Sequence, residues 1–499
     1  MSNQKANLIS NYVAKIWSVV SNFIFVPFYL SIFDESLYGV IIFHASIILL
    51  VNIADSGLSP AFSREVAREL KNIIYVKELL SSLEKVYLTI ILLVLVISYF
   101  SREWLSGFFF ADAKIEGMEY FLFLMFVSAS FQMAMSLYRG AFVGADKQVF
   151  ANTMQILYSF IRSGLVIILL YITPTLDVYF YWQALISFIF LLIYRWKFWG
   201  FLGGAKITGF YKDRLYKILK FSSGMFILAL IGAFNTQIDK FFVTKMLSSQ
   251  DLAVYYIASL LSQVPYMLTL PIAVSCYPKL VSFVKMNDKK GLFELYSKQL
   301  VILSTLASLS IVFVFFYGQD FLISWTGKKE LAFSAFSPML ILALGSFFLS
   351  LQLMPYHLSL SYAYNKVNIF LGLIFIFITP VLLYILISKY SLIGAAIPWL
   401  IMNLVTFVVL NTFLFIKLDS VIGITTFLKY SFSPACIVVF ISIITCSAVL
   451  SLFRILPKNF WLVQACLSAC VVSLLSYFIL KIYFSRIEVN SALINNNPN

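Results

Sequence analysis

Apolar runs of about 20 residues recur along the whole chain, and they constrain the fold more than any other feature of the sequence. A helix of that length crosses the ~30 Å hydrocarbon core of a bilayer. Only 12% of the 499 residues are charged, against roughly 25% in an ordinary soluble domain. A soluble fold of this composition would expose large apolar patches. The sequence therefore predicts one polytopic membrane body without a separate soluble domain.

The spans are predicted to be helices, because barrel strands would be shorter and would alternate in polarity. We predict about fourteen, arranged as an all-α, MATE-like core of twelve helices followed by a C-terminal pair. The first run is too long for the core of a cleavable signal peptide, so it is predicted to be a span. The approximate limits are 9–32, 37–60, 86–101, 118–138, 149–172, 177–194, 221–244, 252–276, 299–317, 331–355, 367–388, 391–416, 430–453 and 461–484.

The basic residues predict an orientation. With a cytoplasmic N-terminus, 25 of the 36 Lys and Arg residues fall on the inner side and 8 in the outer loops. This asymmetry follows the positive-inside rule, so both termini are predicted to be cytoplasmic. It also accounts for the net charge of +14 without a nucleic-acid partner.

Two pairs of similar short segments predict an internal duplication. The segment 37–39 resembles 252–255, and 144–147 resembles 363–366, at offsets of about 215 and 219 residues. Such repeats build many transporters from two halves that rock against each other. The predicted limits are 1–200 for the first half, 201–220 for a basic cytoplasmic linker, 221–416 for the second half, and 417–499 for the extra pair and tail.

Polar residues within the spans fall on common helical faces, counted at 100° per residue. A charge at membrane depth costs roughly 2.5–3.5 kcal/mol, so it usually faces a cavity or a partner. The predicted water-filled cavity would bind an anionic substrate, especially a phosphate, through four cations: Lys15, Arg139, Arg162 and Lys240. Its uncharged lining is predicted to include Asn11, Asn22, Gln155 and Asn235. The candidates for ion coupling are Asp55, Asp239 and His44.

Each of these residues also has a purely structural interpretation. Lys15 and Arg139 lie near inner span ends, where long side chains can extend to the headgroups. Asp239 and Lys240 can pair with neighbours, and His44 can be a hydrogen-bonded packing residue. Arg162 lies nearer the middle of its span, where reaching the headgroups is harder.

The sequence contains no HExxH, GxSxG or P-loop motif. The five cysteines lie in apolar segments without metal-ligand spacing. We therefore expect no enzyme activity, no metal and no cofactor. An ion gradient or downhill flipping would then drive transport.

Three segments carry a family resemblance. They are 7–30 with Pro27, followed by 37–39; Ala54–Leu58, leading into Arg64–Arg68; and Asn235–Lys240, followed by 255–258. Because of the order and spacing of these segments, the chain resembles the Wzx-type lipid-linked oligosaccharide flippases, which are the polysaccharide-exporter branch of the MATE-like MOP superfamily. The resemblance covers about residues 1–416. Many members have twelve spans, so either the last pair is an addition or one segment has been divided.

The resemblance implies a flippase of the bacterial inner membrane. It would move undecaprenyl-diphosphate-linked repeat units from the cytoplasmic to the periplasmic leaflet for O-antigen or capsule assembly. Its partners would be the lipid-linked oligosaccharide, membrane lipids, the polysaccharide polymerase and the chain-length machinery. A MATE-type multidrug or solute exporter and a lipid II-type flippase are the alternatives. A polymerase or ligase fits less well, because the longest external loop, 102–117, is short.

Overall fold

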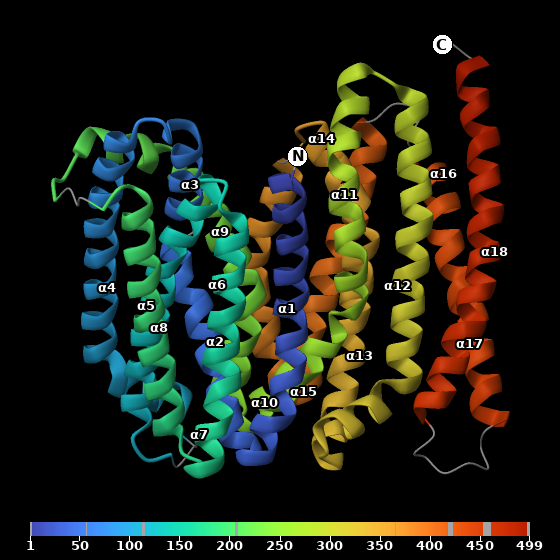
Figure 1. Cartoon of the computed structure of the whole chain (residues 1–499). Coiled ribbons are helices and arrows are strands. Elements are labelled where there is room, and N and C mark those ends of the chain that lie inside the picture. Colours follow the sequence, from blue (N-terminus) through green and yellow to red (C-terminus); the bar gives the residue numbers. More distant parts are fainter. Residues whose placement is uncertain are drawn as a thin grey trace. The chain divides into compact units, whose positions relative to one another are not determined.

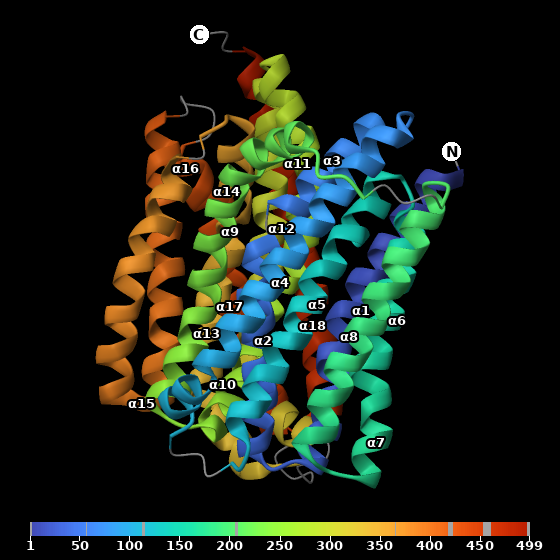
Figure 2. The same cartoon turned by 90° about the vertical axis from the view of Figure 1, so that its left-hand side faces the viewer.

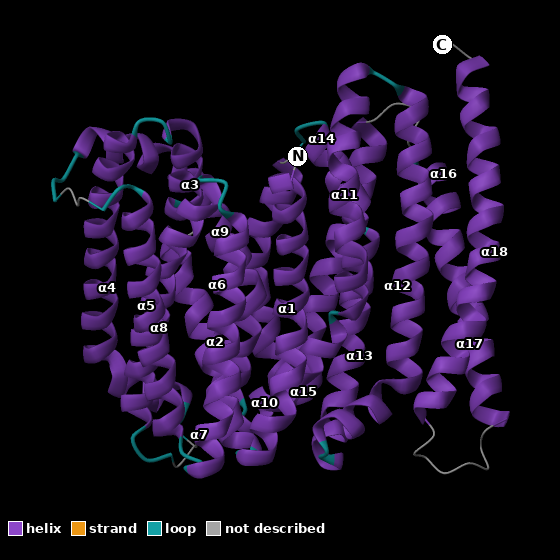
Figure 3. Cartoon of the chain, in the orientation of Figure 1, coloured by secondary structure: helices purple, strands orange, loops and turns teal. Residues whose placement is uncertain are grey.

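The computed structural model describes residues 2–55, 57–111, 115–204, 208–364, 366–417, 423–452 and 461–496. Within these ranges every regular element is helical, and the connections are short (Figure 3). Twelve helical stretches there are long and apolar enough to cross a membrane. The predicted all-α polytopic membrane fold is confirmed.

The chain divides into two compact units, Met1–Ala253 and Val254–Asn499, each described by itself here. The helices of the first unit (Figure 1) are α1 (Ser2–Ile32), α2 (Glu35–Asn52), α3 (Leu58–Glu69), α4 (Ile73–Phe109), α5 (Met118–Gly144), α6 (Gln148–Phe160), α7 (Val166–Ile172), α8 (Leu176–Phe201) and α9 (Lys212–Met246). Two short turns interrupt them, the 3₁₀ turn η1 (Ile53–Asp55) and the π-helical turn η2 (Ile161–Leu165). The predicted duplication and its domain limits remain a prediction.

The second unit begins within α10 (Ser249–Ser262). Its further helices are α11 (Val264–Met286), α12 (Lys289–Thr326), α13 (Lys329–Leu351), α14 (Leu353–Ser361), α15 (Lys366–Lys417), α16 (Ile424–Phe427), α17 (Ser433–Leu452) and α18 (Trp461–Asn496). A π-helical turn, η3 (Leu428–Phe432), joins α16 to α17.

The 52 residues of α15 form two helices that meet at Ser391, whose φ of 50° and ψ of −129° are not helical. The chain reverses its direction here, and the two helices approach each other closely, because a Cβ on Gly394 would lie 2.0 Å from the carbonyl oxygen of Leu386. Figure 2 shows the two arms of α15 side by side. With α15 counted as two spans and the 35-residue α9 added, the helices agree with the predicted fourteen.

Several predicted spans are interrupted in the structure, among them 37–60 and 252–276. The span 37–60 ends as α2 at Asn52, and α3 begins at Leu58. The carboxylate of Asp55 accepts the backbone N–H of Ser59 (3.2 Å), a side-chain bond that competes with a continuous helix. The span 252–276 is divided between α10 and α11, where Pro265 stands in the first turn of α11. Proline favours a helix start because it has no N–H to donate.

The helix α4 is much longer than the predicted span 86–101. Its 37 residues give a length of ~55 Å at 1.5 Å per residue. The stretch before residue 86 mixes apolar residues with Lys77, Glu78, Glu84 and Lys85, and the helix begins where the side chain of Asn72 accepts a hydrogen bond from the backbone N–H of Tyr75 (3.2 Å). Hydropathy marks only the part of a helix that lies in lipid, so it misses such a polar extension.

Two glycines let α3 lie against α5. A Cβ on Gly140 would stand 2.5 Å from Oγ of Ser59, and one on Gly144 would stand 2.1 Å from the carbonyl oxygen of Ser63. Glycines four residues apart permit the close backbone approach that drives helix packing in membranes. This contact fixes α3 beside the end of α5 that carries Arg139.

Candidate functional site

Four separate groups of hydrogen-bonded polar side chains follow one another along α1, α5, α6 and the turns beside α6 in the first unit, and we call them together the polar ladder. It contains Asn7, Asn11, Gln132, Arg139, Asp146, Gln148, Asn152, Gln155 and Arg162. The sequence placed four of these, Asn11, Arg139, Gln155 and Arg162, in its cavity. The structure pairs Arg139 with Gln155, whereas Asn11 and Arg162 belong to separate groups of the ladder.

The first part of the ladder joins α1 to the start of α6. Asn11 donates to Oε1 of Gln148 (2.7 Å), and Asn152 donates to Oδ1 of Asn11 (2.6 Å). One turn earlier, Asn7 donates to the carboxylate of Asp146 (2.7 Å). Asn11 thus bonds to two residues that lie four apart on α6, and Asn7 bonds to the turn that precedes this helix.

Arg139 forms the next step. Its Nη1 donates to Oε1 of Gln155 (3.1 Å), which stands one turn beyond Asn152 on α6. The Arg139 side chain is exposed in the structure. Its only described hydrogen-bond partner is thus a neutral amide oxygen.

Arg162 is the deepest member and lies in the π-helical turn η2. Its Nη1 donates to Oε1 of Gln132 on α5 (3.0 Å), and its guanidinium stands 5.5 Å from the ring centre of Tyr158. Nε of Arg162 is buried without a hydrogen-bond partner among the described residues. π-Helical turns within α-helices often mark functional sites.

Three side chains from other helices donate to successive carbonyl groups of η2. Trp182 donates to the carbonyl of Ile161 (3.1 Å) and Gln183 to that of Arg162 (3.1 Å). Tyr29 donates to the carbonyl of Ser163 (2.7 Å). A π-helical turn is wider than an α-helical turn and disturbs the regular backbone hydrogen bonds from residue i to residue i−4. The three side-chain donors satisfy the carbonyl groups that are poorly paired as a result.

The remaining predicted cations and amides are not joined to the ladder. Lys15 is exposed on α1, and the side chain of Asn22 lies outside the described residues. Lys240 lies 3.6 Å from the carboxylate of its neighbour Asp239 and donates to the carbonyl of Thr236 (3.0 Å). Both residues belong to α9, as does the half-buried Asn235. In the first unit α9 packs mainly on α2, α3 and α4.

Two of the ion-coupling candidates are buried and hydrogen-bonded. His44 shares a 2.6 Å hydrogen bond with Oγ of Ser128. Asp55 accepts hydrogen bonds from the hydroxyls of Tyr87 and Ser136, besides the backbone N–H of Ser59. The described hydrogen bonds of His44 and Asp55 have no partner in common.

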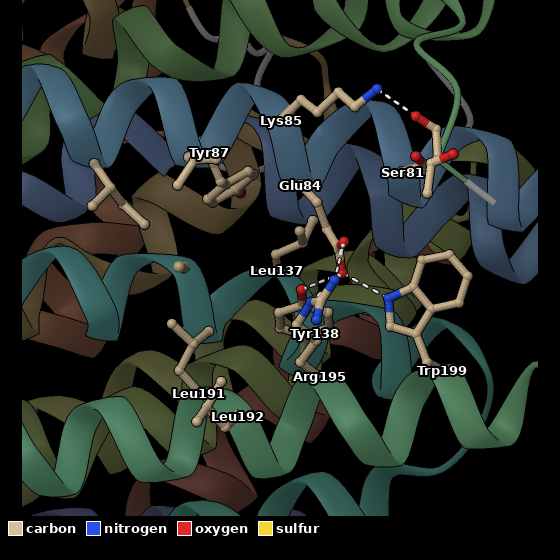
Figure 4. Close-up of a pocket in the computed structure, with 14 residues that line it drawn as sticks. Ser81, Glu84, Lys85, Tyr87, Leu137, Tyr138, Leu191, Leu192, Arg195 and Trp199 are labelled. Carbon is tan, nitrogen blue, oxygen red and sulfur yellow. Dashed lines mark hydrogen bonds and ion pairs between the residues drawn. The ribbon is translucent and has the colours of Figure 1, made fainter. Parts of the chain in front are cut away.

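Sequence reasoning missed a second polar cluster, centred on Glu84 of α4 (Figure 4). Arg195 donates to both carboxylate oxygens of Glu84 (3.0 and 2.9 Å). Trp199 (2.7 Å) and Tyr138 (2.6 Å) donate to the same carboxylate. The cluster lines a cavity of about 400 Å³ between α4, α5 and α8. Its members are up to 115 residues apart, so no local pattern could have found it.

Among the described residues, no group of three or more His, Cys, Asp or Glu side chains could hold a metal ion. The side chains of the polar ladder can bind anions and hydrogen-bonding groups. Its arginines offer donors, and its amides offer both donors and acceptors.

Comparison with known proteins places this site in context. Residues 5–284 match the family described as polysaccharide biosynthesis protein, and this match includes the whole ladder. A search of curated proteins found no significant match.

Solved structures support the fold. The chain resembles "Lipid II flippase MurJ, inward closed conformation", with a TM-score of 0.71 and 17% identity over 97% of this chain and 99% of that one. An inward-facing multidrug resistance MATE family transporter of the MOP superfamily matches with a TM-score of 0.59 and 14% identity, over 82% and 96% of the two chains. A point mutant of the Vibrio cholerae MATE transporter VcmN matches with a TM-score of 0.55 and 12% identity, over 84% and 98%. At these identities the likeness establishes a MurJ- and MATE-like fold.

Proposed function

Because the chain belongs to the polysaccharide biosynthesis protein family, we propose that it carries a lipid-linked oligosaccharide across the membrane that it spans. The finer proposal is the one that the sequence resemblance implies. The cargo would be an undecaprenyl-diphosphate-linked repeat unit, moved from the cytoplasmic to the periplasmic leaflet of a bacterial inner membrane for O-antigen or capsule assembly. No covalent bond of the cargo would change.

The single observation that carries this proposal is the state of the two arginines in the polar ladder. Neither Arg139 nor Arg162 forms an ion pair within the part of the chain that the structure describes. Each instead donates to a glutamine oxygen. A diphosphate that replaced these neutral acceptors would add charge–charge attraction, and one guanidinium can donate two parallel hydrogen bonds to it. The site therefore favours an anion.

The other parts of such a cargo also have counterparts in the chain. The amides of Asn11, Gln148 and Asn152 can exchange hydrogen bonds with sugar hydroxyls. In the second unit an apolar cavity of about 380 Å³ lies between α11, α12 and α18, lined by residues such as Leu268, Phe313 and Ala465. Its chemistry suits a polyprenyl tail.

The similarity of fold to MurJ and to MATE transporters keeps two alternatives open. A lipid II-type flippase would use the same diphosphate site for a different glycan. A multidrug exporter would handle mostly cations, which the arginines of the ladder disfavour. Cytoplasmic termini, coupling to an ion gradient and association with a polymerase belong to the proposal.

Transport of a fluorescent polyprenyl-diphosphate oligosaccharide in proteoliposomes tests the proposal. We expect Arg162→Gln to abolish most of the transport and Arg162→Lys to restore part of it. The matched control is Arg102→Gln, because Arg102 is also half-buried and stands 4.2 Å from a tyrosine ring, that of Tyr99. Normal transport by Arg162→Gln at normal expression would refute the anion site. Export of a cationic dye, unaffected by the lipid-linked oligosaccharide, would favour the multidrug alternative.

A further inference from the structure

The cavity beside Glu84 has a polar end and an apolar end. Figure 4 shows Lys85, Ser81 and Trp199 towards one end and Leu191 and Leu192 towards the other. The order follows the helices, because α4 brings Lys85 first and Leu88 one turn later, and α8 runs past in the opposite sense. The cavity is thus polar at one end and apolar at the other along the direction of the helices, as a lipid is from its headgroup to its acyl chains.

The apolar end is open to the surroundings of the unit. Leu88 is 55% exposed and Leu192 is 47% exposed, and Ile91 and Leu191 are half-buried beside them. Exposed aliphatic side chains on helices of this kind contact acyl chains. The whole cavity holds about 400 Å³, and an acyl chain can occupy its apolar end.

The polar end carries one cation in excess. Arg195 and Glu84 neutralise each other in a bidentate pair. Lys85 donates from Nζ to the carbonyl oxygen of Thr208 (2.5 Å), and no described carboxylate pairs with it. An ammonium group has three donors, so Lys85 can bind a further acceptor. A single phosphate anion matches this charge.

The depth of the cavity matches the boundary between headgroups and hydrocarbon. The apolar part of α4 was predicted from hydropathy to begin at residue 86, and that of α8 to end at residue 194. Lys85 and Arg195 therefore stand immediately outside the apolar segments of both helices. Trp196, which is 68% exposed, and Trp199 add the aromatic residues that are typical of this level.

We infer that this cavity binds one anionic phospholipid of the surrounding bilayer. The phosphate lies at Lys85, and one acyl chain lies along Leu88 and Leu192. A zwitterionic lipid is disfavoured, because its ammonium group would approach Lys85 and Arg195. The inference does not depend on the proposed transport function, since the cavity lies apart from the polar ladder.

Brominated lipids test the inference through Trp199, whose contribution to fluorescence is the difference between wild type and Trp199→Phe. Purified full-length protein is placed in nanodiscs of phosphatidylcholine with either dibrominated phosphatidylglycerol or dibrominated phosphatidylcholine as a minor component. We expect dibrominated phosphatidylglycerol to quench Trp199 at least twofold more. Lys85→Gln should remove that preference, whereas Lys197→Gln should keep it. Lys197 is the matched control because it carries the same charge at the end of α8 but lies against the ring of Trp196 (4.5 Å).

Native mass spectrometry with phosphatidylglycerol gives a second readout that does not need the tryptophan variant. Wild type and Lys197→Gln should retain one more lipid than Lys85→Gln. Equal quenching by both lipids, or equal lipid retention by all three proteins, would overturn the inference. Loss of the preference on addition of inorganic phosphate would also overturn it, because the site would then bind a free anion.

Discussion

The π-helical turn that carries Arg162 gives the sharpest test of how the polar ladder works. Tyr29→Phe removes one hydroxyl and leaves the ring in place. The carbonyl of Ser163 then loses its side-chain donor. The Tyr29 side chain is buried, so water does not readily replace that donor.

The expected loss of stability is ~1 kcal/mol. An unsatisfied buried polar group costs about 1–3 kcal/mol in soluble proteins, whereas side-chain hydrogen bonds in membranes average about 0.6 and reach about 1.7 kcal/mol. If the π-helical turn becomes less stable than a regular helical turn by ~1 kcal/mol, the population of the π-helical conformation relative to the regular one falls about fivefold. Because η2 sets the direction of Arg162 towards Gln132, we expect a lower apparent affinity for a polyprenyl-diphosphate oligosaccharide.

The assay combines thermal unfolding of the purified protein with concentration-dependent transport in proteoliposomes. Tyr194→Phe is the matched control, because its hydroxyl donates to the carbonyl of Ala151 (3.2 Å) on the same span but outside η2. Both variants should unfold at lower temperature, but only Tyr29→Phe should raise the substrate concentration needed for half-maximal transport. Adding Gln183→Leu should enlarge that effect, since it removes a second donor to the turn. Unchanged apparent affinity in the double variant would refute the reasoning.

Three further predictions concern other contacts of the first unit. Gly144→Val should destabilise the protein by ~1–3 kcal/mol in thermal unfolding, because its side chain would overlap the carbonyl of Ser63, whereas Gly200→Ala, with no atom within 4 Å of its Cβ, should not. Glu84→Gln should cost ~1–3 kcal/mol by breaking the bidentate pair with Arg195, while the exposed Glu103→Gln should be neutral; equal unfolding temperatures would contradict this. Lys240→Gln should change the apparent affinity for the diphosphate substrate less than about twofold, since Lys240 is paired with Asp239 on α9; a loss as large as that of Arg162→Gln would place Lys240 in the site.

The spans could be predicted because contact with lipid requires runs of apolar residues that are visible along the sequence itself. Each helix must present about 20 apolar residues, whatever it packs against. The faces of the ladder could also be predicted, because Asn152, Gln155 and Arg162 recur at helical spacing and polar residues in a span seek a common partner. Their hydrogen-bonded partners on α1 and α5 are found in the structure.

What could not be predicted depends on tertiary contacts. The π-turn at Arg162 is held by donors from α1 and α8, and nothing in the local sequence requires the extra residue in the turn. The partners of Glu84 lie on α5 and α8. The sequence assigned both Lys240 and Arg162 to the cationic cavity, yet only Arg162 belongs to the ladder. Helical periodicity shows which residues share a face of one helix, but it does not show which other helix packs against that face.

The charged side chains of the first unit differ in how easily a ligand could replace their partners. Glu84 accepts from three side chains, one of them an arginine, and a ligand there would have to break charge-assisted bonds. Asp55 accepts two hydroxyls and a backbone N–H, so an ion that used it as a ligand would first have to displace these donors. Arg139 and Arg162 have no described carboxylate partner that an anion would have to displace: each donates to a neutral amide, and Arg162 also stands by the ring of Tyr158. Each amide can turn to donate to the same ligand. This difference agrees with the anion site that we propose on the ladder, and it favours structural roles for Asp55 and Glu84.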